Sequence, residues 1–295
     1  MLNFRTDMAD ERVSQYKTQN NISNIDGVTL KTDKGKYYEI TFVEVLNEEG
    51  EKALSKKKGK YISMEIEDTY VLEEETLKKI TEEFSKIIDN VISPYSHKEI
   101  LVVGLGNKKV TPDSLGPKVV DNIDVTRHLF NYAKELVSDE DISVSAIAPG
   151  VLGTTGIETY EIINAIVKKI KPDLVIAIDS LASITKDRVG KSIQITDTGI
   201  SPGSGVKNKR KELSIDTLKV PVIAIGIPLV VDMSTSTFEA LQKIFTKLNI
   251  DKEISYDLLE NVLETENYMV TPKEIDVIVE NLARILAKSI NKVLK

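Results

Sequence analysis

Two aspartates stand where a parallel sheet would bring side chains to one edge. Asp113 follows the apolar run 100–103 through the turn Gly104-Leu105-Gly106-Asn107, and Asp179 comes directly after the apolar run 174–178. The right-handed connections of βαβ units bring the carboxyl ends of parallel strands to the same edge, where open α/β sheets bind ligands. We therefore expect Asp113 and Asp179 to face one cleft.

Two neighbouring carboxyl groups do not ionise independently, because the first negative charge raises the pKa of the second. Over some pH range such a pair holds one proton. One member then activates a water while the other donates to the scissile carbonyl. This predicts peptide hydrolysis with Asp113 and Asp179 as catalytic residues. Gly106, Asn107 and Ser180, which flank the pair, are predicted to contact the substrate.

Each feature also has a simpler interpretation. Asp113 follows Thr111-Pro112, a typical position for the cap or first turn of a helix. The Gly104-Leu105-Gly106-Asn107 turn could hold a phosphate or another anion. Lys109 stands where a dinucleotide fingerprint requires a third glycine, which argues against that cofactor. A non-enzymatic anion-binding module therefore stays open as an alternative.

Composition removes several other kinds of catalyst. The 295 residues include no cysteine and only two histidines, His97 and His128, which excludes thiol nucleophiles and disulfides. His97 precedes its strand, at the wrong end of the sheet. On a continuous helix, His128 would lie roughly 20 Å from Asp113. We expect both histidines to be structural.

Charge and hydropathy limit the partners. The net charge of −7 disfavours direct binding of nucleic acid, which depends on clustered Lys and Arg. No apolar run approaches the roughly 20 residues that cross a bilayer, and the N-terminus has no signal-peptide pattern. We expect a cytoplasmic protein with no membrane partner. The run Lys56-Lys57-Lys58 is expected only to solvate a loop.

The elements that would position the two aspartates are those of a doubly wound, mostly parallel α/β sheet flanked by helices. Continuous β-branched runs predict buried parallel strands, and apolar residues at helical spacing predict the helices between them. The expected strands are 100–103, 144–148, 174–178 and 222–225, and the expected helices are 73–92, 115–137, 157–170 and 275–293.

Three further segments depart from this pattern. Residues 28–66 alternate apolar with polar residues, which predicts a small N-terminal antiparallel meander. Residues 193–220 include a Gly-rich stretch and predict a loop insertion. Residues 1 to about 25 are polar and lack periodicity, which predicts a mobile leader.

Six motifs run in order along nearly the whole chain. They are Arg5-Thr6-Asp7, Gly104-Leu105-Gly106-Asn107, Thr111-Pro112-Asp113-Ser114-Leu115-Gly116-Pro117, Val125-Thr126-Arg127-His128-Leu129, Pro149-Gly150-Val151-Leu152-Gly153-Thr154-Thr155-Gly156 and Ile178-Asp179-Ser180-Leu181-Ala182. Together they are similar to the germination protease of endospore-forming bacteria, also called spore protease. The resemblance implies a tetrameric endopeptidase of the spore core, whose substrates are small acid-soluble spore proteins. It also implies that Asp113 and Asp179 are catalytic.

The same resemblance implies a zymogen that removes its own N-terminal segment. Cleavage after Asp7 would leave Met8 as the new N-terminus, so 1–7 is the expected propeptide and 8–295 a single α/β peptidase domain. The family's core sheet also resembles that of hydrogenase-maturation peptidases, where acids and a histidine hold a metal. No histidine of this chain stands near a later strand end, so we expect no metal and no other cofactor. A metal-dependent maturation-type peptidase is the alternative.

Overall fold

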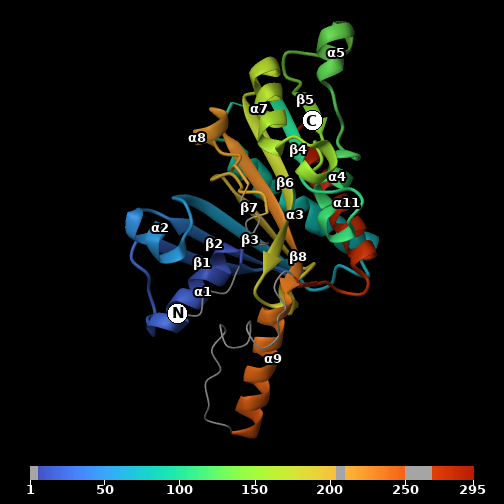
Figure 1. The fold of residues 1–295 in the computed structure, drawn as a ribbon. Helices are drawn as coiled ribbons and strands as arrows, with labels where there is room; N and C mark the ends of the chain where they lie inside the picture. The colour runs from blue at the N-terminus through green and yellow to red at the C-terminus, as the bar shows by residue number, and fades with distance from the viewer. Residues whose placement is uncertain (1–5, 97, 204–209, 250–267) are drawn as a thin grey trace.

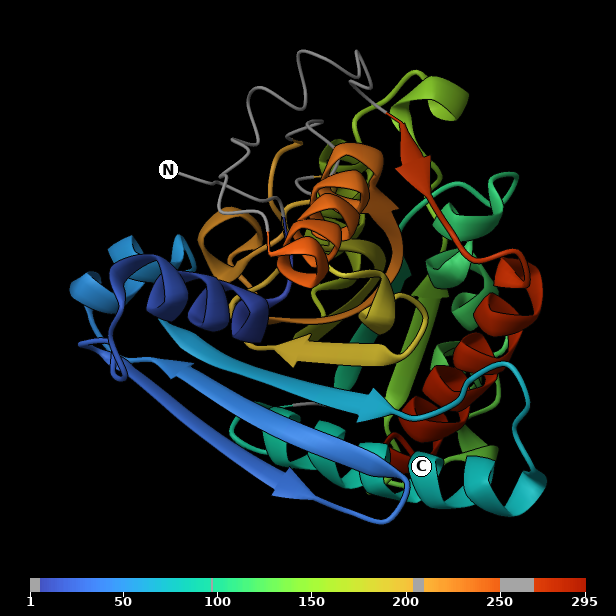
Figure 2. The same ribbon diagram turned by 90° about the horizontal axis from the view of Figure 1, so that it is seen from below.

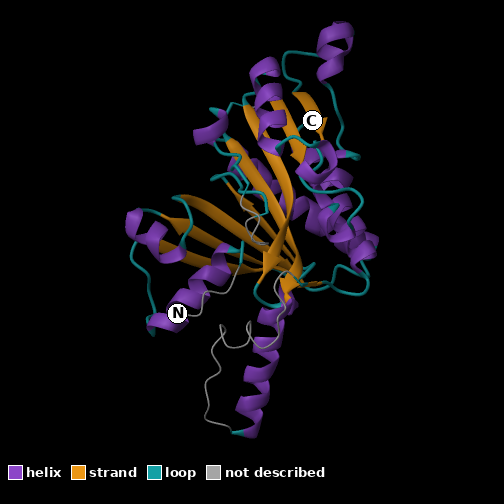
Figure 3. Cartoon of the chain, viewed as in Figure 1, coloured by secondary structure: helices purple, strands orange, loops and turns teal. Residues whose placement is uncertain are grey.

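The computed structural model describes residues 6–96, 98–203, 210–249 and 268–295. Its strands form one continuous sheet in the order β1-β2-β3-β7-β8-β6-β4-β5, with β9 added against β8 (Figure 1 and Figure 3). The strands are β1 Val28–Lys34, β2 Tyr38–Val45, β3 Gly59–Ile66, β4 Glu99–Gly104, β5 Ser143–Ile147, β6 Leu174–Ser183, β7 Ser192–Thr196, β8 Val222–Asp232 and β9 Met269–Val270.

Helices cover both faces of this sheet. The α-helices are α1 Ala9–Asn20, α2 Glu48–Leu54, α3 Glu74–Ile92, α4 Leu115–Val120, α5 Arg127–Tyr132, α6 Leu152–Thr155, α7 Thr159–Ile170, α8 Ile215–Leu218, α9 Met233–Leu248 and α11 Ile275–Val293. Three short 3-10 turns are η1 Thr111–Asp113, η2 Lys134–Leu136 and η3 Lys186–Arg188. None of these helices is long and apolar enough to cross a bilayer.

The centre of the sheet confirms the predicted doubly wound α/β fold. Strands β5, β4, β6 and β8 are parallel neighbours. Successive side chains of a strand point to opposite faces, so Ile100 and Val102 of β4 pack with α3, α4 and α11. Leu101 and Val103 pack on the other face with α7. Burial on both faces explains why these strands are continuous apolar runs.

The predicted meander at 28–66 is present as β1, β2 and β3, but it is not separate from the parallel strands. β3 pairs with β7, and β7 pairs with β8, so the antiparallel strands extend the central sheet. The interval 193–220, expected as a loop, therefore begins inside the buried strand β7 and later contains α8. Ile193 and Ile195 enter the main core, whereas residues 204–209 lie outside the described residues.

The expectation of a mobile leader is wrong for residues 9–20, which form α1. Met8 and Ala9 are fully buried and Val13 is 2% exposed. Ala9 and Val13 pack with side chains of α2 and β2, and Figure 2 shows α1 over one face of β1–β3, with α3 across the other. The sequence does not reveal this helix, because its buried residues lie near its first turn and form no periodic apolar stripe. Residues 1–5 of the expected propeptide lie outside the described residues.

The single helix expected over 115–137 is also wrong. α4 ends at Val120 and α5 begins at Arg127. The intervening Asp-Asn-Ile-Asp-Val-Thr contains only residues of modest helix propensity. His128 is exposed on α5, and His97 lies outside the described residues.

Candidate active site

The candidate site lies where the chain changes direction across the sheet. β4 connects outward to β5, and β5 connects back across β4 to β6. Such a switch point is where open α/β sheets bind ligands. Gly104, the last residue of β4, aligns with Ile178, so Asp179 is the first residue of β6 beyond the end of β4. Asp179 was expected to end its strand, but β6 continues beside β8 to Ser183.

Asp113 reaches this point through a tightly folded turn. The Leu105 N–H donates to the Ile178 carbonyl at 2.8 Å, and the Asn107 N–H donates to the Asp113 carbonyl and to its Oδ2, each at 2.9 Å. Gly106 has a φ of +108°, and a Cβ there would lie 2.1 Å from the Asp113 carbonyl oxygen. Gly106 and Asn107 therefore position Asp113 through the backbone. Contact with a substrate stays a prediction for both.

Asp113 and Asp179 line one cavity of about 280 Å³. Asp179 is 6% exposed, and burial raises its pKa well above the ordinary value. The negative charge of Asp113 raises that pKa further, whereas the Ser180 N–H, 2.9 Å from Oδ1, lowers it. Burial also raises the pKa of Asp113, opposed by the Asn107 N–H. The pair thus keeps a proton at pH values where exposed aspartates have lost theirs.

Two backbone amides of the Gly104–Asn107 turn, and one just after it, donate within the protein. Those of Leu105 and Asn107 bond as described above, and the Lys109 N–H donates to Asn107 Oδ1 at 3.0 Å. An anion at this turn would need such amides as donors. Ser180 Oγ is buried beside the pair and has no hydrogen-bond partner among the described residues. Its predicted contact with substrate is untested.

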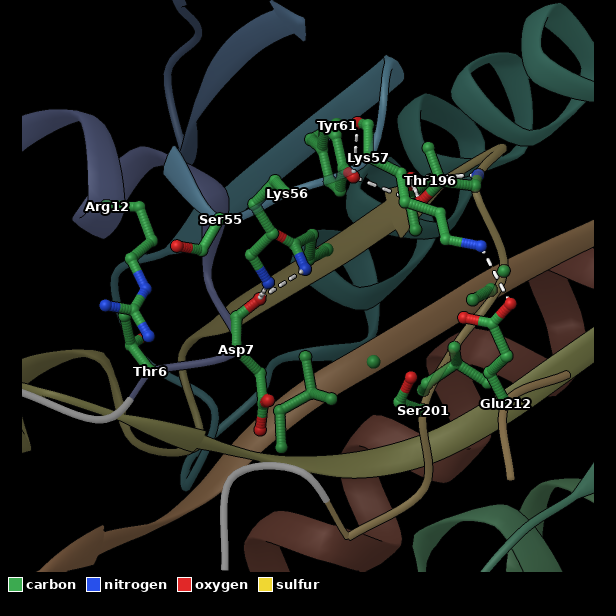
Figure 4. Close-up of a pocket in the computed structure, with 17 residues that line it drawn as sticks. Thr6, Asp7, Arg12, Ser55, Lys56, Lys57, Tyr61, Thr196, Ser201 and Glu212 are labelled. Atoms are coloured by element: carbon green, nitrogen blue, oxygen red, sulfur yellow. Dashed lines mark hydrogen bonds and ion pairs between the residues drawn. The ribbon is translucent and has the colours of Figure 1, made fainter. Parts of the chain in front are cut away.

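The N-terminal segment enters the same cavity, because Asp7 forms part of its wall. The Asp7 N–H donates to the Ala182 carbonyl at 3.1 Å, and the Ala182 N–H donates to Asp7 Oδ2 at 3.0 Å. On its other side the Asp7 carbonyl accepts from Lys56 Nζ at 2.7 Å and from Gln194 Nε2 at 3.1 Å (Figure 4). Asp7, expected to precede the cleaved bond, therefore lies beside the predicted catalytic pair.

Sequence reasoning missed Lys56 and Gln194. Lys56 was expected to solvate a loop, which is wrong, because its ammonium points inward to Asp7. Burial lowers the pKa of Lys56, and the charge of Asp7 opposes that effect. In a run of three lysines, the sequence does not indicate that the first one points inward. Gln194 was missed because residues 193–220 were expected to form a loop, whereas Gln194 lies in β7.

A buried ionic cluster anchors the segment that follows Asp7. Arg188 Nη2 lies 2.7 Å from Asp10 Oδ2 and 3.0 Å from Glu65 Oε1, and Arg188 Nη1 lies 3.9 Å from Glu11 Oε1. Glu11 also accepts from Ser183 Oγ at 2.6 Å. Burial raises the pKa of Glu11, opposed chiefly by the Arg188 charge. These contacts hold the start of α1 against the end of β6.

In the described part of the chain, no group of three or more His, Cys, Asp or Glu side chains is arranged to hold a metal ion.

Comparisons with known proteins give one consistent family. The model of the germination protease family matches residues 5–257. The germination protease of Caldanaerobacter subterraneus subsp. tengcongensis is 45% identical, over 100% of this chain and 95% of that protein. Those of Clostridium acetobutylicum and Priestia megaterium are 43% and 39% identical, over 99% and 98% of this chain and 95% and 93% of theirs.

Among solved structures, a [NiFe] hydrogenase maturation protease, HycI from Thermococcus kodakarensis, matches with a TM-score of 0.37 and 19% identity. The match covers 70% of this chain and 98% of that chain.

Proposed function

The chain belongs to the germination protease family, and from that premise we propose that Asp113 and Asp179 are its catalytic pair. Membership gives the chain a protease role in spore germination. In the proposed reaction it is an endopeptidase that begins the degradation of small acid-soluble spore proteins. The observation that carries the proposal is the cavity that the two aspartates share, in which burial raises the pKa of both.

In the proposed mechanism the two carboxyl groups act as one unit that holds a single proton. Asp179 keeps the proton, because its pKa is raised well above the ordinary value by burial and then by the Asp113 charge. The Asp113 carboxylate accepts a proton from the attacking water. Asp179 then protonates the departing nitrogen. This is the division of roles that unequal carboxyl environments produce in other hydrolases.

The proposal includes a zymogen. Residues 1–7 are the propeptide, cleavage between Asp7 and Met8 leaves 8–295, and the propeptide blocks the pair because Asp7 forms part of the wall of its cavity. A homotetramer located in the spore core belongs to the same proposal, on the strength of the family alone.

Neither alternative gains support from the site. The amides that an anion-binding turn would use are engaged at Leu105, Asn107 and Lys109. No arrangement of side chains in the described residues favours the metal-dependent alternative.

The test replaces each aspartate by its amide. Asp113→Asn and Asp179→Asn should each slow cleavage of a purified small acid-soluble spore protein by at least about 10²-fold, the usual contribution of a general acid or base. The fragments are followed by mass spectrometry. Asp121→Asn is the matched control, because Asp121 is an exposed aspartate paired only with Lys108 among the described contacts. Near-normal cleavage by both site variants would contradict the proposal.

A further inference from the structure

Two side chains from the antiparallel half of the molecule converge on one backbone carbonyl. Lys56 lies just before β3, and Gln194 lies within β7, next to β3 in the sheet. Both donate to the Asp7 carbonyl oxygen, at 2.7 and 3.1 Å. In Figure 4 the Lys56 ammonium points to this oxygen, while the Asp7 carboxylate points away from it.

Gln194 also grips the chain beyond the bond expected to break. Its Oε1 accepts from the Ala9 N–H at 2.8 Å, while its Nε2 donates to the Asp7 carbonyl. One amide side chain thus spans the bond between Asp7 and Met8. The opposite side of Asp7 is paired with Ala182 of β6. Hydrogen bonds therefore hold the chain on both sides of this bond.

We infer that Lys56 and Gln194 are further catalytic residues, which bind the carbonyl oxygen of the bond that is cut. The inference rests on the proposed function, in which that bond joins Asp7 to Met8. After the propeptide leaves, the same two donors hold the corresponding carbonyl of a bound protein substrate. Asp7, which helps to line both the cavity of the pair and the neighbouring cavity of about 440 Å³, connects the two groups.

The reaction moves charge onto this oxygen. As the water oxygen bonds to the Asp7 carbonyl carbon, the Asp113 carboxylate takes a water proton and the π electrons move to the carbonyl oxygen. The oxyanion then re-forms the carbonyl while the bond to the Met8 nitrogen breaks, and that nitrogen takes the Asp179 proton. One water is consumed, the products are the α-carboxyl group of Asp7 and the amine of Met8, and the pair still holds one proton.

A donor that contacts this oxygen gains strength as the charge develops. A hydrogen bond to an anion is about twice as strong as one between neutral groups. Lys56 and Gln194 therefore stabilise the transition state more than the intact peptide, which is the condition for catalysis. Removing one donor of this kind lowers kcat by about 10²–10³-fold in other enzymes.

The neighbouring lysine provides a matched control. Lys57 lines the same cavity of about 440 Å³ but pairs with Glu212 at 2.7 Å and with Asp216 at 3.2 Å. Figure 4 shows its ammonium turned toward Glu212. Lys57→Met makes the same chemical change as Lys56→Met, the loss of one ammonium group. It leaves both donors to the Asp7 carbonyl in place.

The experiment follows the self-cleavage of the full chain by N-terminal sequencing for Met8. Lys56→Met should slow cleavage by about 10²-fold, Lys56→Arg should recover part of the rate, and Lys57→Met should leave it unchanged. Gln194→Glu keeps the acceptor for Ala9 but loses the donor to Asp7, so it should also be slow. Thermal unfolding shows whether each variant is folded. If Lys56→Met is not, the rate of self-cleavage of Gln194→Glu tests the inference.

A second assay separates chemistry from binding. Wild type and variants are each produced directly as residues 8–295 and given a synthetic peptide with the sequence of residues 1–14. For Lys56→Met we expect kcat to fall while KM changes little. If Asp179→Asn is inactive but Lys56→Met and Gln194→Glu cleave like the wild type, the inference is overturned and the proposed function stands. If Asp113→Asn and Asp179→Asn both cleave normally, the proposed function itself is overturned.

Discussion

At the scale of single residues, burial opposes the ionisation of Asp179. Its side chain is 6% exposed and it faces Asp113. Burying a carboxylate beside another negative charge opposes folding. Ionised Asp179 therefore lowers the stability of the folded state, and the same effect favours its protonated form.

This arrangement predicts how stability depends on pH. The folded-state pKa of Asp179 lies above its unfolded value, so its stabilising contribution is complete below about pH 4 and is lost as the pH rises through the folded pKa. Asp179→Asn removes this loss and keeps an acceptor for the Ser180 N–H. We expect the variant to be more stable than the wild type at neutral pH, because the unfolded Asp179 gains from ionisation there and the folded one does not.

Denaturant unfolding at several pH values measures this difference. The advantage of Asp179→Asn should shrink toward zero in acid. An advantage of equal size at every pH would show that the ionisation of Asp179 is not its source.

Gly106 offers a second prediction at this scale. Its positive φ and the 2.1 Å approach to the Asp113 carbonyl leave no room for a side chain. Gly106→Ala should cost about 1–3 kcal/mol of backbone strain and displace Asp113, so proteolysis should fall sharply. Gly153→Ala is the control, since a Cβ there meets nothing within 4 Å. Equal activity of the two variants would argue against backbone positioning of Asp113.

At the scale of elements, α1 is held by ion pairs as well as by apolar contacts. Arg188 pairs with Asp10 and Glu11, whose side chains are 10% and 6% exposed. Arg188→Met would remove the ion-pair partner of both carboxylates and should destabilise the chain by about 3–5 kcal/mol. Faster cleavage within α1 by a protease in limited digestion would locate the effect.

The control for that prediction is Arg284→Met. Arg284 pairs with Glu74 at the surface, with side chains 46% and 74% exposed, and such pairs contribute at most about 1 kcal/mol. A similar loss of stability in both variants would mean that the buried cluster does not anchor α1.

The sequence is informative about some elements and silent about others for physical reasons. The parallel strands are predictable because burial on both faces makes them continuous apolar runs. That Asp113 and Asp179 share a cavity is predictable because parallel strands bring their carboxyl ends to one edge. The first turn of α1, Lys56 and Gln194 acquire their roles only from tertiary contacts between distant segments, and no local pattern records those contacts.

At the scale of the whole molecule, one sheet positions both groups of the proposed site. Lys56 and Gln194 come from its antiparallel side, whereas Asp179 comes from its parallel side. Asp7 bridges the two within its own chain. Self-cleavage should therefore be a first-order reaction, with a half-life that does not change on serial dilution. A rate that falls in proportion to concentration would indicate that one molecule cuts another.

The complete burial of Met8 has a consequence for the direction of that reaction. In the intact chain its nitrogen is a neutral amide that donates to Thr6 Oγ1 at 2.9 Å. Hydrolysis would turn it into an ammonium in a dry interior, at a cost of several kcal/mol unless a carboxylate neutralises it. Glu11 loses its hydrogen bond from Thr6 Oγ1 when Thr6 departs, but it stays engaged by Arg188, Ser183 and the Ile184 N–H. The new ammonium group therefore disfavours the return of the Met8 nitrogen to its buried position, which opposes re-formation of the peptide bond.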